Sequence, residues 1–229
     1  MVQKNMIPSV VATLQDNSVH GEDTFLTRDL GDGAFLDVVM DGVTNHGGEE
    51  ASRSLSETLA SAELSSVDDV VSALADMNEE FYLVGGGHFL LSTVSAALFF
   101  DGRLYIVSAG DSPVYLVRSD GFQQLSGRKG GFLPVGAARA VGAAERVDLT
   151  RVEVAVQPGD RLVLATDGVS DNLAAEELAE IVRAAPSAAQ AAEQVNNVIA
   201  TRIKEGRTPS MLGGRFRHDD RTAVFRFFE

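Results

Sequence analysis

The chain has 229 residues, of which 45% are hydrophobic and 23% charged, and its 19 Lys and Arg against 33 Asp and Glu give a formal net charge of −14. This apolar content excludes a disordered chain, because enough apolar surface is available to offset the loss of chain entropy on folding. The acidic balance argues against nucleic acid as a partner, because phosphate backbones are bound through Lys and Arg.

The absence of cysteine excludes disulfides, thiolate metal sites and enzymes with a cysteine nucleophile. The most apolar run, residues 93–100, is much shorter than the ~20 residues that span a bilayer. The first eight residues lack the features of a secretory signal. We therefore expect a cytoplasmic protein without a membrane partner, and, since no linker or internal repeat divides residues 1–229, a single domain.

Segments rich in Val, Leu, Ile and Phe and bounded by Gly, Asp or Pro predict β-strands along most of the chain. Asp101-Gly102 and Asp120-Gly121 each lie between two such segments, which is typical of a two-residue hairpin loop. Much of the sheet structure is therefore expected to be antiparallel. The predicted strands are residues 9–14, 34–40, 92–100, 103–109, 113–118, 122–125, 149–156, 161–165 and 222–228.

Helical spacing of apolar residues appears in two adjacent pairs, at residues 51–62 and 70–81 and again at residues 178–185 and 188–203. Ser187 and Gln190 have the spacing of a capping box at the start of the last helix. Because strands and helices are segregated, the pattern indicates an α+β fold in which helices cover two packed sheets.

Acidic residues recur where predicted strands end. Asp41-Gly42 follows residues 34–40 and Asp167-Gly168 follows residues 161–165, and neither pair lies in a hairpin. Two such strand ends could face each other across the fold. Mg²⁺ and Mn²⁺ take oxygen ligands, and two ions together activate water and stabilise charge on a phosphoryl group. Metal-assisted phosphoester hydrolysis is the resulting hypothesis, and acidic residues that merely cap loops are the alternative.

Short motifs of this kind follow one another over residues 10–228: Gly21-Glu22-Asp23, Asp41-Gly42, Gly47-Gly48, Ala51-Ser52, Ser92-Thr93, Gly110-Asp111-Ser112, Arg139–Gly142, Gly159–Gly168 and Asp219–Thr222. In this order and spacing they resemble the metal-dependent protein phosphatases of type 2C, the PPM family, and look like a compact bacterial member. The resemblance implies a four-layer αββα sandwich, two mainly antiparallel sheets flanked by helix pairs, in agreement with the α+β pattern.

The resemblance also implies a centre for two Mn²⁺ or Mg²⁺ ions. Asp41 would bridge the two ions. Asp167 and Asp219 would complete the shell of one ion, and Glu22 with the Gly42 carbonyl would serve the other. 

Three further acidic residues belong to this set. Asp111, together with Asp167, matches the family's weaker third metal site. Asp23 and Asp220 would support the ligands from outside the coordination spheres. The implied reaction is direct attack of a metal-bound water on a phosphoserine or phosphothreonine ester of a protein. A Ser/Thr kinase or a phosphorylated regulator is the implied partner.

The sequence departs from the family pattern near the substrate. Ser18 stands where an arginine normally grips the phosphate, and Val43 where some members carry a histidine. Pro113 replaces an arginine after Asp111-Ser112, and Thr44-Asn45-His46 are additional residues. A catalytically impaired protein that acts as a phosphoprotein-binding or regulatory module is therefore the alternative function. A two-metal nuclease is disfavoured by the negative charge.

His20, His46 and His218 flank the acidic motifs, and an imidazole there could protonate the leaving alkoxide. We select His46 as the catalytic candidate, with a solvated loop histidine as the alternative.

Residues 202–221 carry a local excess of basic residues. Guanidinium groups bind phosphate through two parallel hydrogen bonds. We hypothesise that Arg215 or Arg217 supplies the phosphate contact missing at Ser18, with a solvated basic loop as the alternative.

Overall fold

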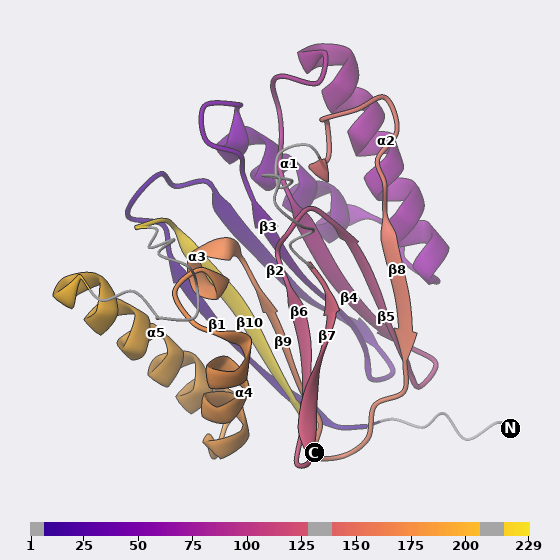
Figure 1. The fold of residues 1–229 in the computed structure, drawn as a ribbon. Coiled ribbons are helices and arrows are strands. Elements are labelled where there is room, and N and C mark those ends of the chain that lie inside the picture. The colour runs from indigo at the N-terminus through magenta and orange to yellow at the C-terminus, as the bar shows by residue number, and fades with distance from the viewer. Residues whose placement is uncertain (1–6, 128–138, 207–217) are drawn as a thin grey trace, which may run out of the picture.

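Two five-stranded antiparallel sheets lie face to face in the computed structural model, which describes residues 7–127, 139–206 and 218–229 (Figure 1). Sheet A has the strand order β1-β10-β9-β6-β7 and sheet B the order β2-β3-β4-β5-β8. The strands are β1 (Ser9–Asp16), β2 (Asp23–Gly31), β3 (Ala34–Asp41), β4 (Val94–Phe100), β5 (Arg103–Ala109), β6 (Val114–Arg118), β7 (Gly121–Ser126), β8 (Thr150–Val154), β9 (Arg161–Ala165) and β10 (Arg221–Phe228).

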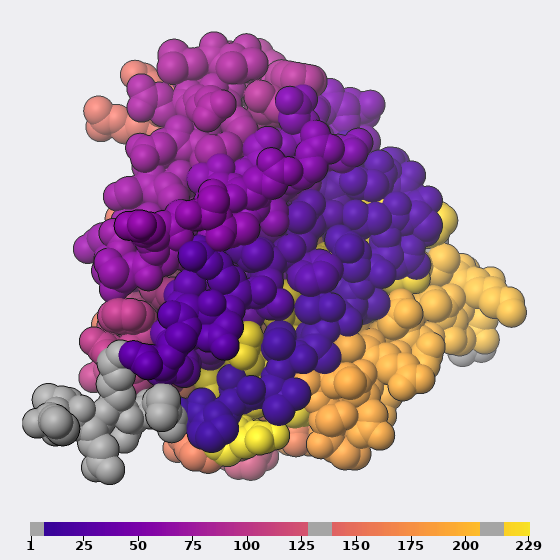
Figure 2. Space-filling view, turned by 180° about the vertical axis from the view of Figure 1, so that it is seen from behind, coloured from indigo at the N-terminus to yellow at the C-terminus, as the bar shows by residue number. Residues whose placement is uncertain are grey.

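Helix pairs cover the outer faces of the two sheets. Sheet B carries α1 (Gly48–Ser61) and α2 (Val67–Gly85), and sheet A carries α4 (Ala175–Ala184) and α5 (Ala188–Glu205). In Figure 2 the purple-to-magenta pair and the orange pair lie on opposite sides of the indigo and yellow strands. The short helix α3 (Asp167–Ser170) follows β9. The predicted four-layer α+β sandwich is confirmed.

Apolar side chains fill the spaces between the layers in three separate clusters. β3 shows the reason, because successive side chains of a strand point to opposite faces. Leu36, Val38 and Met40 pack toward α1 and α2, whereas Phe35 and Val39 pack toward sheet A.

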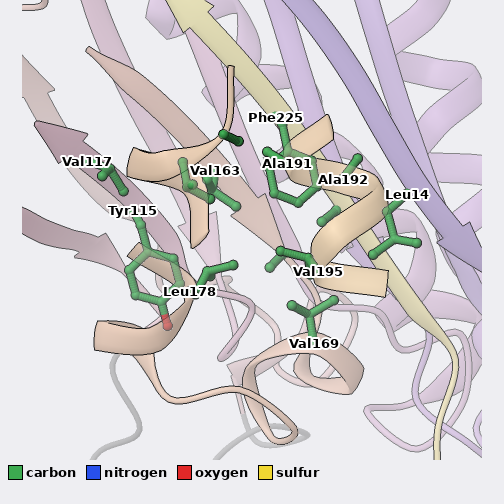
Figure 3. Packing of buried hydrophobic residues seen from close by; sticks show 14 of the residues in the cluster. Leu14, Tyr115, Val117, Val163, Val169, Leu178, Ala191, Ala192, Val195 and Phe225 are labelled. Atoms are coloured by element: carbon green, nitrogen blue, oxygen red, sulfur yellow. The ribbon is translucent and has the colours of Figure 1, made fainter. Parts of the chain in front are cut away.

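The helices that cover sheet A contact it largely through small side chains. Ala191, Ala192 and Val195 of α5 lie over Leu14 and Phe225 of the sheet (Figure 3). Small side chains let the helix approach the strands closely. The predicted cap of this helix is confirmed, because the N–H of Gln190 donates to Ser187 Oγ at 3.3 Å.

One predicted hairpin loop is confirmed, and the other lies one residue earlier than predicted. Asp101 and Gly102 form a two-residue loop with φ of 51° and 75°, the positive values that a type I′ turn requires. Asp120-Gly121 is not the second loop, because Gly121 already pairs with Arg118 as the first residue of β7. The loop there is Ser119-Asp120.

β2 has no counterpart among the predicted strands. Its sequence, DTFLTRDLG, lacks a run of apolar residues because it is a half-buried edge strand. Arg28 lies on its outer side and donates to the carbonyls of Leu59 and Ala62 at 3.0 and 2.7 Å. The polar residues of this strand therefore serve the end of α1.

One ion pair is buried between the sheets. Arg226 of β10 donates to both carboxylate oxygens of Asp37 on β3, at 2.5 and 2.8 Å. Its guanidinium also lies 3.7 Å from the centre of the Phe35 ring. Burial raises the pKa of Asp37, and Arg226 opposes that shift.

Within the described ranges, no helix is both long and apolar enough to cross a membrane.

Candidate active site

Strand ends from both sheets meet at one edge of the space between them. Asp41, the last residue of β3, shares the inward-facing side of that strand with Phe35, Asp37 and Val39. Asp23 lies directly opposite it in the register of β2. Across the gap, β9 ends just before Thr166-Asp167 and β10 starts just after Asp219-Asp220.

Asp41 is the centre of this group of carboxylates. Burial raises the pKa of its carboxyl well above the ordinary value, and Asp167, Asp23, Asp111 and Asp219 raise it further, in that order. The two strand-end motifs predicted to face each other are thus close enough to interact, as are the later acidic motifs. The site concentrates negative charge from residues that are far apart in the chain.

Asp23 is almost completely buried and joins the two sheets. Thr166, which directly follows β9 of sheet A, donates from its hydroxyl to the Asp23 carboxylate at 2.8 Å, and the same hydroxyl accepts the N–H of Thr222 at 2.9 Å. Burial raises the pKa of Asp23 to about 8; the Thr166 hydrogen bond opposes this, and Asp167 and Asp220 add to it.

Asp220 organises the loop that precedes β2. Its carboxylate accepts the backbone N–H groups of Val19, His20 and Glu22 at 2.9, 3.0 and 2.9 Å. Gly168 lies against it, since a Cβ at position 168 would fall 1.8 Å from the Asp220 carbonyl oxygen. Backbone contacts from both ends of the chain therefore fix this corner of the site.

Glu22 is half-buried beside the loop between β3 and α1. The hydroxyl of Thr44 donates to its Oε2 at 2.6 Å, and the N–H of Gly42 donates to its carbonyl at 3.1 Å. Thr44 belongs to the additional segment noted in the sequence, where Asn45 has a φ of 65° that asparagine tolerates better than most residues. This segment therefore positions a predicted ligand.

Two glycines make the approach of α1 to the site possible. A Cβ on Gly42 would lie 2.3 Å from the carbonyl carbon and oxygen of Gly48, and one on Gly48 would lie 2.5 Å from the Gly42 carbonyl carbon. The start of α1 is thus packed directly on the backbone that follows Asp41.

The three histidines noted in the sequence differ in their surroundings. Nδ1 of His46 lies 2.7 Å from the carbonyl of His88, so this nitrogen carries the proton and donates. Nε2 of His20 lies 3.8 Å from the Asp219 carboxylate on a more exposed side chain. His218 is exposed beside Asp219. Of the three, His46 has the ring orientation fixed by a short hydrogen bond to the backbone.

A buried group of hydroxyls lies next to Asp111; the sequence motifs include Ser92-Thr93 and Ser112, but their contact with one another was not predicted. Ser112 Oγ is 2.7 Å from Thr93 Oγ1, and Ser95 donates to the Ser112 carbonyl at 2.6 Å. Ser92 donates to the carbonyl of Asp41 at 3.1 Å. The available signal was the concentration of Ser and Thr at residues 92–95, directly before and within the start of β4.

The region of the missing arginine holds a different polar network. Ser18 is exposed, and its N–H donates to Asp16 at 3.1 Å. Arg221 is engaged by Asp16 at 2.5 Å and by Asn196 at 3.1 Å. Arg215 and Arg217, the predicted phosphate ligands, lie outside the described residues.

In the part of the chain that the structure describes, no three Asp, Glu or His side chains converge in the arrangement of a ready-made ion site. The carboxylates around Asp41 are nevertheless a donor set suited to hard divalent cations, because oxygen ligands are what Mg²⁺ and Mn²⁺ prefer. Burial is the largest cause of the raised pKa of Asp41, and repulsion from these carboxylates adds to it; bound cations would relieve that repulsion.

The family described as Stage II sporulation protein E (SpoIIE) matches residues 29–226. No curated protein sequence matches the chain. Solved structures with the same fold include PppA, described as a key regulatory component of T6SS in Pseudomonas aeruginosa, with a TM-score of 0.78, 22% identity and coverage of 97% of this chain and 99% of that one. 

Two serine/threonine phosphatase structures are similarly related. Stp1 from Staphylococcus aureus has a TM-score of 0.78 and 18% identity, and covers 100% of this chain and 98% of that one. PstP/Ppp from Mycobacterium tuberculosis has a TM-score of 0.73 and 23% identity, and the match covers 96% of this chain and 99% of that one. At these identities the structural likeness establishes the fold.

Proposed function

Because the chain belongs to the SpoIIE family, a bacterial type of metal-dependent protein phosphatase, we propose that it hydrolyses phosphoserine or phosphothreonine esters of proteins. The observation that carries this proposal is the electrostatic effect on Asp41 of four other carboxylates, Asp167, Asp23, Asp111 and Asp219, which add to the effect of burial on its pKa. A carboxyl whose pKa is raised by several neighbouring carboxylates suits a site that binds cations.

In this proposal the ligands are the residues that sequence reasoning selected. Asp41 would be shared by two Mn²⁺ or Mg²⁺ ions, Asp167 and Asp219 would hold one, and Glu22 and the Gly42 carbonyl the other. When bound, such ions lower the pKa of water and neutralise charge on phosphoryl oxygens. 

The remaining residues of the set have supporting roles. Asp111 would contribute to a third ion. Asp23 and Asp220 would orient their neighbours through the hydrogen bonds to Thr166 and to the N–H of Glu22. Thr44 joins them, since it holds the Glu22 carboxylate.

His46 is the proposed proton donor to the leaving alkoxide. With Nδ1 donating to the His88 carbonyl, protonation of Nε2 would give an imidazolium that releases its proton from a fixed ring. Arg215 or Arg217 remains the proposed contact for the substrate phosphate, with a phosphorylated protein of a kinase pathway as the partner.

The test is hydrolysis of p-nitrophenyl phosphate and of a phosphothreonine peptide by metal-stripped protein to which Mn²⁺ is returned. We expect Mn²⁺-dependent turnover that Asp167→Asn lowers at least ~10³-fold, since removing a ligand to a catalytic ion removes its stabilisation of transition-state charge. Asp68→Asn is the matched control, because that aspartate is 80% exposed on α2.

The alternative is a catalytically impaired phosphoprotein-binding module, favoured by Ser18 at the arginine position and by the engagement of Arg221 with Asp16 and Asn196. Mn²⁺ binding without turnover on either substrate would select this alternative. For His46, the decisive comparison is His46→Ala on a poor leaving group against p-nitrophenyl phosphate: equal retention of activity on both would remove it from the mechanism.

A further inference from the structure

An exposed apolar patch lies at the C-terminal end of α2. Leu83, Val84 and Phe89 are 76%, 67% and 46% exposed, although residues of this size and type are usually buried. Phe89 packs against Gly85, the residue that follows Val84, since a Cβ at position 85 would lie 3.1 Å from the Cβ of Phe89. We call these three residues the α2 patch. It lies in the upper part of Figure 1, where the chain leaves α2.

The α2 patch is connected to the candidate active site by the backbone. Val43 donates to the carbonyl of Leu91 at 2.9 Å, and Leu91 donates to the carbonyl of His46 at 3.1 Å. The Phe89 ring covers Gly47, where a Cβ would lie 2.8 Å from the ring. The segment that carries Phe89 is thus fastened to the segment that follows Asp41.

Backbone strain holds Phe89 in its exposed position. Leu90 has a φ of 57°, which is unusual for a residue other than glycine, asparagine or aspartate. In this conformation Leu90 is 8% exposed while its neighbour Phe89 faces outward. Strain of this kind persists where the surroundings enforce it and is most frequent at binding and catalytic sites.

Acidic residues surround the α2 patch. Glu79 and Glu80 are exposed one helical turn before Leu83 and Val84, so they lie on the same side of α2. Glu49 and Glu50 are exposed in the first turn of α1, just after the glycine that Phe89 covers, and Glu49 is also paired with Arg53 at 3.6 Å. α2 itself contains no Lys or Arg. The charge around the patch therefore complements a cationic partner.

We propose that the α2 patch binds the segment of a phosphoprotein substrate next to its phosphorylated residue, and that this segment combines large apolar side chains with Lys or Arg. The inference rests on the proposed phosphatase function and specifies its substrate class. The path from Asp41 through Val43 and Leu91 to Phe89 spans at most about 20 Å, which about six extended residues cover. The apolar residues should therefore lie within about six positions of the phosphothreonine.

The test uses three phosphothreonine peptides of equal length: one with Leu and Lys in the flanking segment, one with Leu replaced by Ser, and one with Lys replaced by Glu. We expect kcat/KM to be about tenfold higher for the first than for either of the others. In Leu83→Ser/Val84→Ser the advantage of Leu over Ser should fall to about one. Val10→Ser/Val11→Ser is the matched control, because these exposed valines lie on β1, away from the strand ends that form the site.

Turnover of p-nitrophenyl phosphate, measured for each protein, separates the two hypotheses. Its absence in the wild-type protein with Mn²⁺ would contradict the phosphatase function, and fluorescence anisotropy with the same peptides would then still test binding to the α2 patch. Turnover without peptide discrimination, or equal loss of discrimination in the Val10/Val11 control, would overturn the inference. So would light scattering that shows a dimer dissociated by Leu83→Ser/Val84→Ser, since the occupant would then be a second copy of the chain.

Discussion

Two aspartates on the same face of β3 show how differently one strand can use a carboxylate that faces the other sheet: Asp37 is fully buried and Asp41 is half-buried. Asp37 lies midway along the strand and receives two hydrogen bonds from Arg226 of the facing sheet. Asp41, at the end of the strand, is instead influenced mainly by burial and by other carboxylates. The fold thus neutralises the buried Asp37 itself, whereas in the function proposed above cations would neutralise Asp41.

The largest expected loss of stability comes from breaking the buried ion pair between Arg226 and Asp37. Arg226→Met leaves Asp37 buried without its cation, and we expect the free energy of unfolding in urea to fall by about 3–5 kcal/mol. Arg103→Met is the matched control, because its pair with Glu153 is more than half exposed and should contribute at most about 1 kcal/mol. Equal effects of the two substitutions would show that the buried pair has no special structural role.

At the candidate site, we expect stability and shape to depend on the close contact between the backbones of Gly168 and Asp220. Gly168→Ala places a Cβ 1.8 Å from the Asp220 carbonyl oxygen, so we expect a loss of about 2–3 kcal/mol in stability together with a loss of phosphatase turnover. Gly121→Ala is the control, since nothing lies within 4 Å of its Cβ. Unchanged Mn²⁺ affinity in Gly168→Ala would contradict the view that this contact shapes the site.

A smaller effect, opposite in sign, is expected at Asp41. Asp41→Asn removes a charge from a group of like charges, so the metal-free protein should gain about 1 kcal/mol of stability at neutral pH. Saturating Mn²⁺ should raise the melting temperature of the wild-type protein measurably and that of the variant much less. Calorimetry with and without the ion measures both. The comparison between Asp37 and Asp41 fails if the metal-free variant is less stable than the wild-type protein.

Tyr115 provides a third type of buried ionisable group and the smallest effect at neutral pH. Burial, with a contribution from Glu176, raises its pKa to about 12 from 10.0. Because the pKa is raised on folding, its contribution to stability is complete below pH 10 and is lost as the pH rises toward 12. Between pH 10 and 12, the free energy of unfolding should therefore fall less steeply with pH in Tyr115→Phe than in the wild-type protein. Identical alkaline unfolding curves would contradict this.

The position of much of the candidate site could be predicted because several of its residues stand at strand ends next to glycine. Asp41-Gly42 and Asp167-Gly168 follow apolar runs, and each run correctly predicts a strand, β3 and β9. Once the strand ends are known, alternation of side chains places Asp41 on the inward face. The roles assigned to these residues stay predictions, as do the two-ion centre and the proton donor.

Other features depend on contacts that have no local signal. The Asp220 carboxylate accepts the N–H groups of three residues at positions 19, 20 and 22, which lie 198 to 201 residues earlier in the chain. Thr44 donates to Glu22 from a loop that looked like an insertion. β2 was missed because an edge strand needs few apolar residues. The ion pair between the sheets did have a signal, a single charge inside each of two apolar strands, FLDVVM and AVFRFF.

The pairing of β1 with β10 has a consequence for biosynthesis. Ser9 pairs with Phe228 and Asp16 with Arg221. β1 therefore cannot pair until β10 has been synthesised, and β10 is the last strand of either sheet in the chain. Sheet B, by contrast, is composed of strands that are translated earlier. Strands that are so distant in the chain pair slowly, and their edges stay exposed until the pairing forms. We therefore expect nascent chains that end before β10 to carry a folded half with α1 and α2, an incomplete sheet A, and no assembled carboxylate centre.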